Sequence, residues 1–234
     1  MKITNKILLT VVSIMFLLVL ILVVVSRIII ERESWVDDFN EFNSDIVENE
    51  YNISDFSSVK IAGLRDVSIQ SGDEYRIIIN SSDSLSESVD VRKNGDTLAI
   101  EYSDYRQERV GSVRAEITMP DISYLDLTKG ARVFLNDFNT DELKASILDA
   151  CRLIGDENTI GNLYLRCTGD SQVKLRRSST VNADLDVSGD SKVIMKMSGG
   201  DLTGKVTGDA TIVYYGEVRS DRLEFSGNVT IRIR

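Results

Sequence analysis

Four oxygen-bearing side chains recur at one position of a segment that repeats through the C-terminal half of the chain. They are Asp170, Asp190, Asp209 and Asn228, which follow one another at nearly equal intervals. Carboxylate and amide oxygens are the ligands that Ca²⁺ prefers, so repeats stacked about 4.8 Å apart would form a row of calcium ligands. The alternative is a row of turns, because Asp and Asn bond readily to the local backbone. The chain lacks the dense nonapeptide pattern of calcium-binding β-rolls, so we favour the turns and expect no metal.

The chain has two cysteines, Cys151 and Cys167, which are too few for a disulfide scaffold. An oxidising exterior would permit one disulfide between them. Their offset within the repeat does not guarantee the Cα separation below about 7 Å that the bond requires. Unpaired cysteine commonly serves as a small, buried apolar residue. We favour two free, buried thiols and keep the disulfide as the alternative.

Basic side chains are scattered among acidic ones through the repeats. They include Arg176, Arg177, Lys192, Lys196, Arg219, Arg222, Arg232 and Arg234. A solvated surface of mixed charge explains this scatter, and a site for an anionic glycan is the alternative. The last two arginines would also protect an exposed final strand from edge-to-edge aggregation.

The composition argues against catalysis and against nucleic acid. The chain has no histidine, which removes the usual general base, the commonest metal ligand and the catalytic triads that depend on it. No pair of carboxylates stands out from the general Asp content. The net charge is −10, and an acidic protein repels phosphate backbones. We therefore expect no enzyme, no cofactor and no nucleic-acid partner.

A regular internal repeat must position these side chains. Six segments align without gaps, at residues 125–135, 145–155, 165–175, 185–195, 204–214 and 223–233. Their central positions are Lys129, Asp149, Gly169, Gly189, Gly208 and Gly227, at almost constant spacing. The period is about 20 residues, and regular self-similarity of this length is typical of a solenoid.

Within each segment, apolar and polar residues alternate on both sides of the central position, as in Leu165, Cys167, Val173 and Leu175. Alternation at period two predicts strands with one buried face, and it excludes a helical solenoid. We therefore predict an all-β, parallel, β-helix-like solenoid.

Glycine at the centre predicts a corner with positive φ, which glycine adopts without steric cost. Gly169, Gly189, Gly208 and Gly227 supply it in the last four repeats. Lys129 replaces the glycine in the first repeat and Asp149 in the second, so we expect those corners to be less regular or shifted.

The N-terminal half is less repetitive. Residues 59–69 fit the same template with Gly63 at the centre, and alternating or apolar runs follow at 75–79, 89–91, 98–102 and 113–119. Asn94-Gly95 is a strong hairpin signal, so we expect part of this half to be antiparallel.

The N-terminal segment predicts a membrane anchor. Ile7 to Ser26 contains no charged residue, and twenty helical residues at about 1.5 Å each span a bilayer's hydrocarbon core of about 30 Å. A cleaved signal peptide is the main alternative, but the apolar run is long and lacks a small-x-small cleavage site. Lys2 and Lys6 precede the run and acidic residues follow it, which places the N-terminus in the cytoplasm. We predict a cytoplasmic segment at 1–6, a single-pass signal anchor at 7–30 in the inner membrane, and a periplasmic or extracellular ectodomain.

Residues 31–52 connect this anchor to the ectodomain, which we place at 53–234. Trp35, Phe39, Phe42 and Ile46 form a helical stripe among acidic residues. We predict an acidic juxtamembrane helix or linker that docks on the first strands, with binding to a partner or to the membrane surface as the alternative.

The chain also resembles a known family. FSSVKIAGLRDVSIQSGDEYRIII, KNGDTLAIEY and ITMPDISYLDL, followed by the Ser/Thr-Gly-Asp units and the closing SGNVTIRI, are similar to the head GIN domain family of auto-transporter adhesins, found mainly in Bacteroidetes. The resemblance covers about residues 55–234. It implies a right-handed β-helix-like fold, an exported location and no established enzymatic activity, and it supplies no catalytic residues.

These observations lead to a function hypothesis and an alternative. The first is a non-enzymatic, membrane-anchored module of the bacterial envelope that binds a protein or glycan. The alternative is a structural or sensor subunit of a membrane signalling complex. A polysaccharide hydrolase is disfavoured, because the repeats are short and have no long loop insertions. The sequence makes no prediction of oligomeric state.

Overall fold

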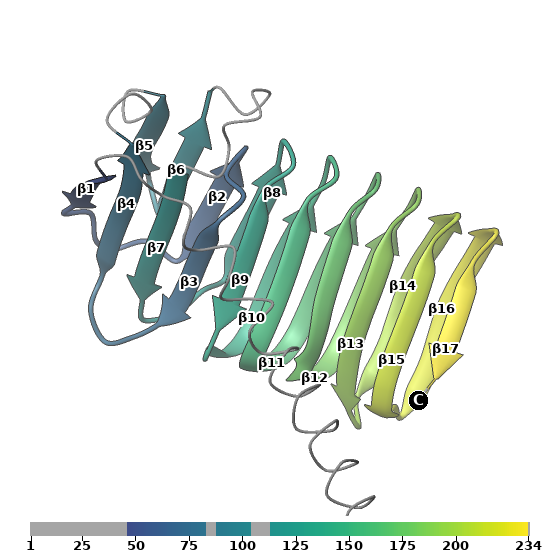
Figure 1. The fold of residues 1–234 in the computed structure, drawn as a ribbon. Coiled ribbons are helices and arrows are strands. Elements are labelled where there is room, and N and C mark those ends of the chain that lie inside the picture. The colour runs from purple at the N-terminus through teal and green to yellow at the C-terminus, as the bar shows by residue number, and fades with distance from the viewer. Residues whose placement is uncertain (1–45, 83–87, 104–112, 234) are drawn as a thin grey trace, which may run out of the picture. The chain divides into compact units, whose positions relative to one another are not determined.

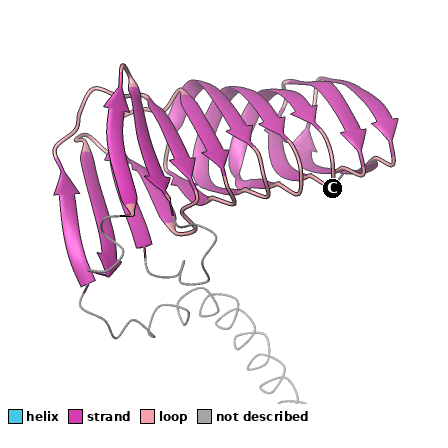
Figure 2. Cartoon of the chain, turned by 90° about the horizontal axis from the view of Figure 1, so that it is seen from above, coloured by secondary structure: helices cyan, strands magenta, loops and turns pink. Residues whose placement is uncertain are grey.

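The computed structural model describes residues 46–82, 88–103 and 113–233, and all regular structure within these ranges is β-strand (Figures 1 and 2). The strands are β1 (Ile46–Tyr51), β2 (Ser58–Ala62), β3 (Val67–Ser71), β4 (Arg76–Ser82), β5 (Val89–Asn94), β6 (Thr97–Tyr102), β7 (Val113–Met119), β8 (Tyr124–Thr128), β9 (Arg132–Asn136), β10 (Asn139–Ile147), β11 (Arg152–Cys167), β12 (Gln172–Val187), β13 (Lys192–Ser198), β14 (Asp201–Gly208), β15 (Thr211–Glu217), β16 (Ser220–Gly227) and β17 (Thr230–Ile233). The expected anchor at 7–30 and most of the juxtamembrane stretch lie outside the described residues. Within those ranges, no helix has the length and apolar character needed to cross a membrane.

The strands form two faces that enclose one core. Face A runs in the order β5-β6-β2-β8-β10, then the second halves of β11 and β12, then β14 and β16. Face B runs in the order β1-β4-β7-β3-β9, then the first halves of β11 and β12, then β13, β15 and β17. Both long strands cross from face B to face A, which joins the faces into one 17-stranded sheet. The prediction of an all-β solenoid is confirmed.

The register of the strands follows the alignment of the repeats. On face A, Leu165 pairs with Ala145 and with Leu185. On face B, Val173 pairs with Leu153 and with Val193. Equivalent apolar residues therefore stack one above another between the faces, where they are almost completely buried. One turn alone could not bury such a face, and the stack can.

The first turn in the sequence lies inside the stack. Val59 pairs with Leu125 and Val67 with Val133, so residues 59–69 keep the predicted register. On their other side, β2 and β3 pair in parallel with β6 and β7, which come later in the chain. The chain thus leaves the stack after β3, builds an outer turn and returns to β8.

Antiparallel pairing is confined to this N-terminal part of the described residues. β5 and β6 form the predicted hairpin, in which Asn94 pairs with Thr97 and Gly95-Asp96 is the two-residue loop. Gly95 has a φ of +62°, as the first loop residue of a type II′ turn requires.

Residues 46–51 correct the predicted boundary of the ectodomain. They form β1, which pairs antiparallel with β4 from Ile46↔Ser82 to Tyr51↔Ile77, so the helix or linker predicted over 31–52 does not extend through them. Val47, Asn49 and Tyr51 are half-buried while Glu48 and Glu50 are exposed, which is the alternation of a strand. The β-domain therefore includes residues 46–51, which lie before its predicted start at residue 53.

The corners between the faces come in two forms. Gly63, Gly169, Gly189, Gly208 and Gly227 have φ between +76° and +104°. In the first two repeats two successive residues take positive φ, at 58° and 73° for Lys129-Gly130 and at 56° and 61° for Asp149-Ala150. The expected irregularity of these corners is therefore a second left-handed residue. Lys129 also forms an ion pair with Glu101 of β6.

The last turn leaves part of the core column uncovered. Phe225 is 48% exposed and Ile233 is 66% exposed, whereas Val206, one turn earlier, is fully buried. β16 and β17 thus form an open end of the described stack.

Candidate functional site

The acidic row occupies the corners of four successive turns. Asp170, Asp190, Asp209 and Asn228 are all exposed, and the Nδ2 of Asn228 donates a hydrogen bond to the Oδ1 of Asp209 at 3.0 Å. Among the residues that the structure describes, no group of three Asp, Glu or Cys side chains is placed to hold a metal ion. Each of the four is an exposed residue beside a corner glycine.

The two cysteines lie on opposite faces and are free and buried. Cys167 stacks between Ile147 and Val187 on face A. Cys151 begins face B, where its backbone N–H donates to the Oγ of Ser171 at 3.2 Å. Burial raises the pKa of each thiol to about 11. Since the thiolate is the reactive form, neither is poised as a nucleophile.

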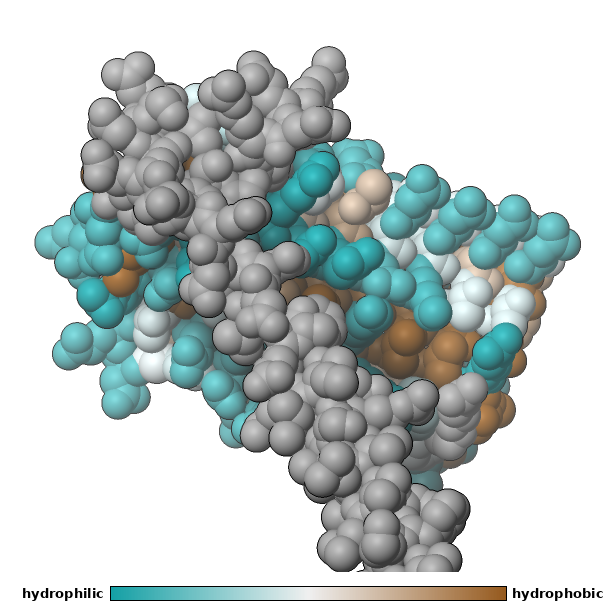
Figure 3. Space-filling view, viewed as in Figure 1, coloured by the Kyte–Doolittle hydropathy of each residue, from teal (hydrophilic) through white to brown (hydrophobic). Residues whose placement is uncertain are grey.

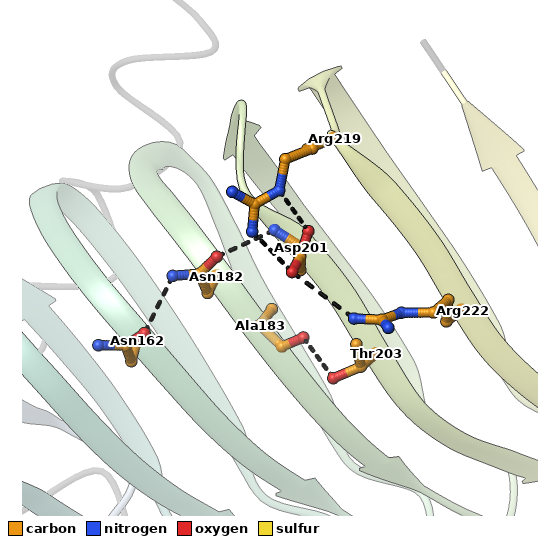
Figure 4. A network of polar contacts seen from close by, with 7 residues as sticks. All are labelled: Asn162, Asn182, Ala183, Asp201, Thr203, Arg219 and Arg222. Atoms are coloured by element: carbon orange, nitrogen blue, oxygen red, sulfur yellow. Dashed lines mark hydrogen bonds and ion pairs between the residues drawn. The ribbon is translucent and has the colours of Figure 1, made fainter.

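A polar network ties together the turns of face A at their second corner (Figure 4). The Nδ2 of Asn182 donates to the Oδ1 of Asn162 at 3.0 Å, and the backbone N–H of Asp201 donates to the Oδ1 of Asn182 at 3.0 Å. The guanidinium of Arg219 donates twice to the Asp201 carboxylate, at 2.9 and 2.8 Å, which lowers the pKa of that carboxyl. Arg222 lies 3.6 Å from the same carboxylate, so two arginines share Asp201 and the network links neighbouring turns of the stack.

A depression of about 340 Å³ lies on the outer surface of face A, over β8, β10, β11 and β12. Three of its four charged side chains are compensated within the protein, and Asp184 takes part in none of the ion pairs of the described residues. Lys144 pairs with Glu142 at 3.0 Å and lies 5.9 Å from the centre of the Tyr164 ring, while Arg166 pairs with Asp186 at 3.7 Å. The depression therefore offers little free charge to a ligand.

The outer surface of face B is different. Two outward-facing columns cross six turns of it, and neither contains an Asp or Glu. The first column is Arg132, Arg152, Gln172, Lys192, Thr211 and Thr230, and the second is Phe134, Ile154, Lys174, Ile194, Val213 and Arg232. We call Arg132, Arg152, Lys174 and Lys192 the cationic strip, and Phe134, Ile154, Ile194 and Val213 the apolar row.

The cationic strip has no acidic partner among the described residues. The ion pairs found there involve none of its four members. The pKa of Lys174 is lowered, first by partial burial and then by repulsion from Arg152 and Lys192. Like charges held together without compensation cost stability, which is the pattern expected where a ligand of opposite charge binds.

The strip has definite limits. At its N-terminal end, Asp66 precedes the neighbouring β3 and is paired with Arg114 at 2.9 Å. Along the corner, Asp170 and Asp190 lie two residues before Gln172 and Lys192, and no ion pair in the described part of the chain joins the two rows. The most positive part is thus the region around Arg132, Arg152 and Lys174.

The apolar row lies beside the strip and is largely half-buried. Figure 3 shows apolar side chains gathered over β13 and β15, beside hydrophilic side chains. Face B can therefore contact a ligand that carries both anionic groups and apolar surface.

Comparison with known proteins places this fold in a family. The model of the family described as "Putative auto-transporter adhesin, head GIN domain" matches residues 55–195, more than half of the 234-residue chain. The chain belongs to the head GIN domain family. No protein with a curated description matches it.

Solved structures of other proteins have the same fold. A "putative adhesin" from Bacteroides fragilis aligns with a TM-score of 0.66 at 14% identity, covering 81% of this chain and 97% of the other. A "putative adhesin" from Parabacteroides distasonis aligns with a TM-score of 0.53 at 10% identity, covering 82% and 98%. At these identities the likeness concerns the fold alone.

Sequence reasoning did not find the cationic strip of this family member. It noted Lys192 and Lys196 among scattered bases and attached no role to Arg132, Arg152 or Lys174. The signal was available in the alignment, three residues after each central position, where Arg132, Arg152 and Lys192 share a column. The outward columns do not contribute to the core, so the fold itself does not depend on this pattern.

Proposed function

We propose that this head GIN domain protein is a non-enzymatic adhesion or ligand-binding module of the bacterial envelope, and that its ligand contacts the cationic strip. The observation that carries the proposal is a line of uncompensated cations, one on each of four consecutive turns, in a chain of net charge −10. The family's description as an adhesin supports a binding role.

The proposal includes display from the inner membrane by a signal anchor at residues 7–30, with residues 1–6 in the cytoplasm and a right-handed coil outside. The apolar run of the sequence supports it. We expect the protein to remain in the membrane fraction after alkaline extraction. Protease added to the outside of spheroplasts should digest the β-domain, and protection of that domain would contradict this orientation.

Binding is tested with the full chain in an uncharged detergent, screened against a glycan array and immobilised envelope proteins. Arg132→Glu, Arg152→Glu and Lys192→Glu together should abolish the signal. The matched control is Lys144→Glu, Arg166→Glu and Lys205→Glu on face A, which changes the net charge equally and should retain the signal. Equal loss in both triple variants, or no bound ligand, would refute the proposal.

One observation favours the alternative of a structural or sensor subunit. β1 pairs with β4 along its whole length, so the chain is held in the sheet from residue 46 onward through β1. A displacement of the preceding segment would thus be transmitted to face B. Co-purification with an inner-membrane partner that is lost on deleting residues 31–45, and kept in the face B variant, would support this role instead.

A further inference from the structure

Arg132, Arg152 and Lys192 of the cationic strip lie in one straight column, and Lys174 lies in the column beside it. Arg132, Arg152, Gln172 and Lys192 pair directly from strand to strand without a register shift. Neighbouring parallel strands lie about 4.8 Å apart, so the cations of the strip extend over about 14 Å along the stacking direction, across the strands of face B (Figure 1). A small anion could touch only one or two of these cations, whereas a linear polyanion could contact all four.

The neighbouring apolar row narrows the chemistry of the ligand. Phe134, Ile154 and Ile194 are half-buried in the sheet surface and interleave with the cations turn by turn. A sugar ring in an acidic polysaccharide presents an apolar C–H face and a charged edge, which match these two lines. Arginine in turn holds planar carboxylate or sulfate groups with two parallel hydrogen bonds.

Two other polyanionic partners fit less well. Binding to an anionic membrane surface relies on apolar side chains that insert below the headgroups, and the apolar row is instead set into the sheet. Single-stranded nucleic acid is bound by stacking successive bases on aromatic rings, and Phe134 is the one aromatic residue of the two columns.

We infer that the cationic strip binds a linear acidic polysaccharide along the stacking direction, with its anionic groups on the strip and its sugar rings against the apolar row. The inference rests on the proposed function and gives its ligand a chemical class. Binding is predicted to be polyvalent, because each turn contributes one weak contact and the contacts share one chain.

The experiment titrates the full chain, in an uncharged detergent, with fluorescently labelled polygalacturonate as a carboxylate polymer, heparin as a sulfated one and dextran as a neutral control. We expect binding of at least one polyanion and none of dextran. The stronger polyanion identifies the anionic group. Raising the salt from about 50 to about 200 mM should weaken binding at least about tenfold, because several ionic contacts release counterions.

Variants test the place of binding. Arg152→Gln should raise Kd about tenfold through loss of one charged contact, and Arg152→Lys, which keeps the charge but not the paired hydrogen bonds, should restore part of the affinity. Arg166→Gln on face A is the matched control and should leave Kd within about twofold. Circular dichroism and melting curves establish that all three variants are folded.

Three outcomes would overturn the inference. They are competition by galacturonate monomer at the same carboxylate concentration, equal weakening by Arg152→Gln and Arg166→Gln, and failure to bind either polyanion. Binding is also measured to vesicles that contain phosphatidylserine. If they capture the protein through the strip while the polysaccharides do not, the polysaccharide is refuted but the proposed binding role of face B stands. If no probe is bound and the wider screen is also negative, the proposed function fails as well.

Discussion

The two faces of this solenoid share one backbone register but differ in how charged side chains are arranged on their outer surfaces. On face A, one outward column reads Lys60, Asp126, Ser146, Arg166, Asp186, Lys205 and Glu224, so neighbouring turns mostly present opposite charges. Lys60 and Asp126 lie 3.3 Å apart, and Arg166 and Asp186 lie 3.7 Å apart. From β9 to β17, face B presents like charges on neighbouring turns with no carboxylate in either column, and the first turn contributes Asp66, which is paired with Arg114.

The difference indicates which charges serve the stack. Opposite charges on adjacent strands support the pairing, whereas like charges oppose it. Because face A shows that this fold can carry a compensated ladder, the cations of face B are not a requirement of the architecture. Their presence on adjacent turns agrees with the proposed binding of an anionic ligand to this face.

The largest expected effect comes from breaking the corner that joins the faces. Gly169 and Gly189 both have a φ of +76°, but a Cβ added to Gly189 would lie 2.9 Å from the carbonyl oxygen of Gly169. A Cβ on Gly169 would meet no atom closer than 3.8 Å, because the Asp149 corner beneath it has a different shape. Gly189→Val should therefore destabilise the domain by about 3 kcal/mol, and Gly169→Ala by about 1 kcal/mol.

Urea unfolding of both variants measures this difference. Gly189→Ala should also be measured, because it can be compared with Gly169→Ala as the same substitution at two corners. Unfolding free energies that fall equally in Gly169→Ala and Gly189→Ala would contradict the direct stacking of the glycine corners. Binding to the cationic strip should fall with the folded fraction in each variant.

The regular half of this architecture could be read from the sequence, because identical spacing and an inward period of two leave one way to stack the turns. The pairing of Leu165 with Leu185 follows directly from their equivalent positions in successive repeats. The position of β6 and β7 could not be predicted in this way. No pattern in their sequence indicates that they pair with the free edges of β2 and β3, opposite β8 and β9. β1 was missed because Ile46 completed a helical stripe, while the two-residue alternation of Val47, Asn49 and Tyr51 was short.

The candidate site was less accessible to sequence reasoning than the fold. A core reveals itself by which residues are apolar, but an outward cation is informative only when its neighbours on adjacent strands are known. Lys174 lies in a column with Ile154 and Ile194, so it looked like an interruption of an apolar pattern. In the folded protein Lys174 is a cation beside Arg152 and Lys192, and its pKa is lowered first by partial burial and then by repulsion from these two residues.

Alkaline pH should lower the stability of the domain, because each face buries one neutral thiol. The pKa of Cys151 on face B and of Cys167 on face A is raised from 9.0 to about 11 by burial. Because the unfolded thiols ionise first, their contribution to stability is complete below about pH 9 and is lost as the pH rises towards 11. The loss should be on the order of 2 kcal/mol per thiol. The pKa of Tyr214, raised to about 12 by burial and by Asp221, extends the loss above pH 10.

The measurement is the unfolding free energy between about pH 8 and 11. Cys151→Ala and Cys167→Val replace each thiol by a residue already present in its column, namely Ala131 and Val187. The double variant should lose less stability over this range, and an unchanged slope would contradict burial of the neutral thiols. Alkylation without reductant should label neither cysteine in the folded chain and both after denaturation. Labelling that requires reductant would establish the disulfide instead.

The smallest expected effect is also the most direct test of the contrast between the faces. Arg152→Gln removes a cation that repels its neighbours, so it should stabilise the domain by about 0.3 kcal/mol. Arg166→Gln removes the partner of Asp186, an exposed pair, so it should destabilise the domain by about 0.3 kcal/mol. Both shifts should nearly vanish in about 1 M salt, where the screening length falls to about 3 Å. Melting curves of the two variants at low and high salt therefore test the prediction, because the two shifts in stability should have opposite signs. Destabilisation by Arg152→Gln at low salt would mean that its guanidinium supports the stack through packing, and the case for a ligand on face B would then depend on the binding titrations alone.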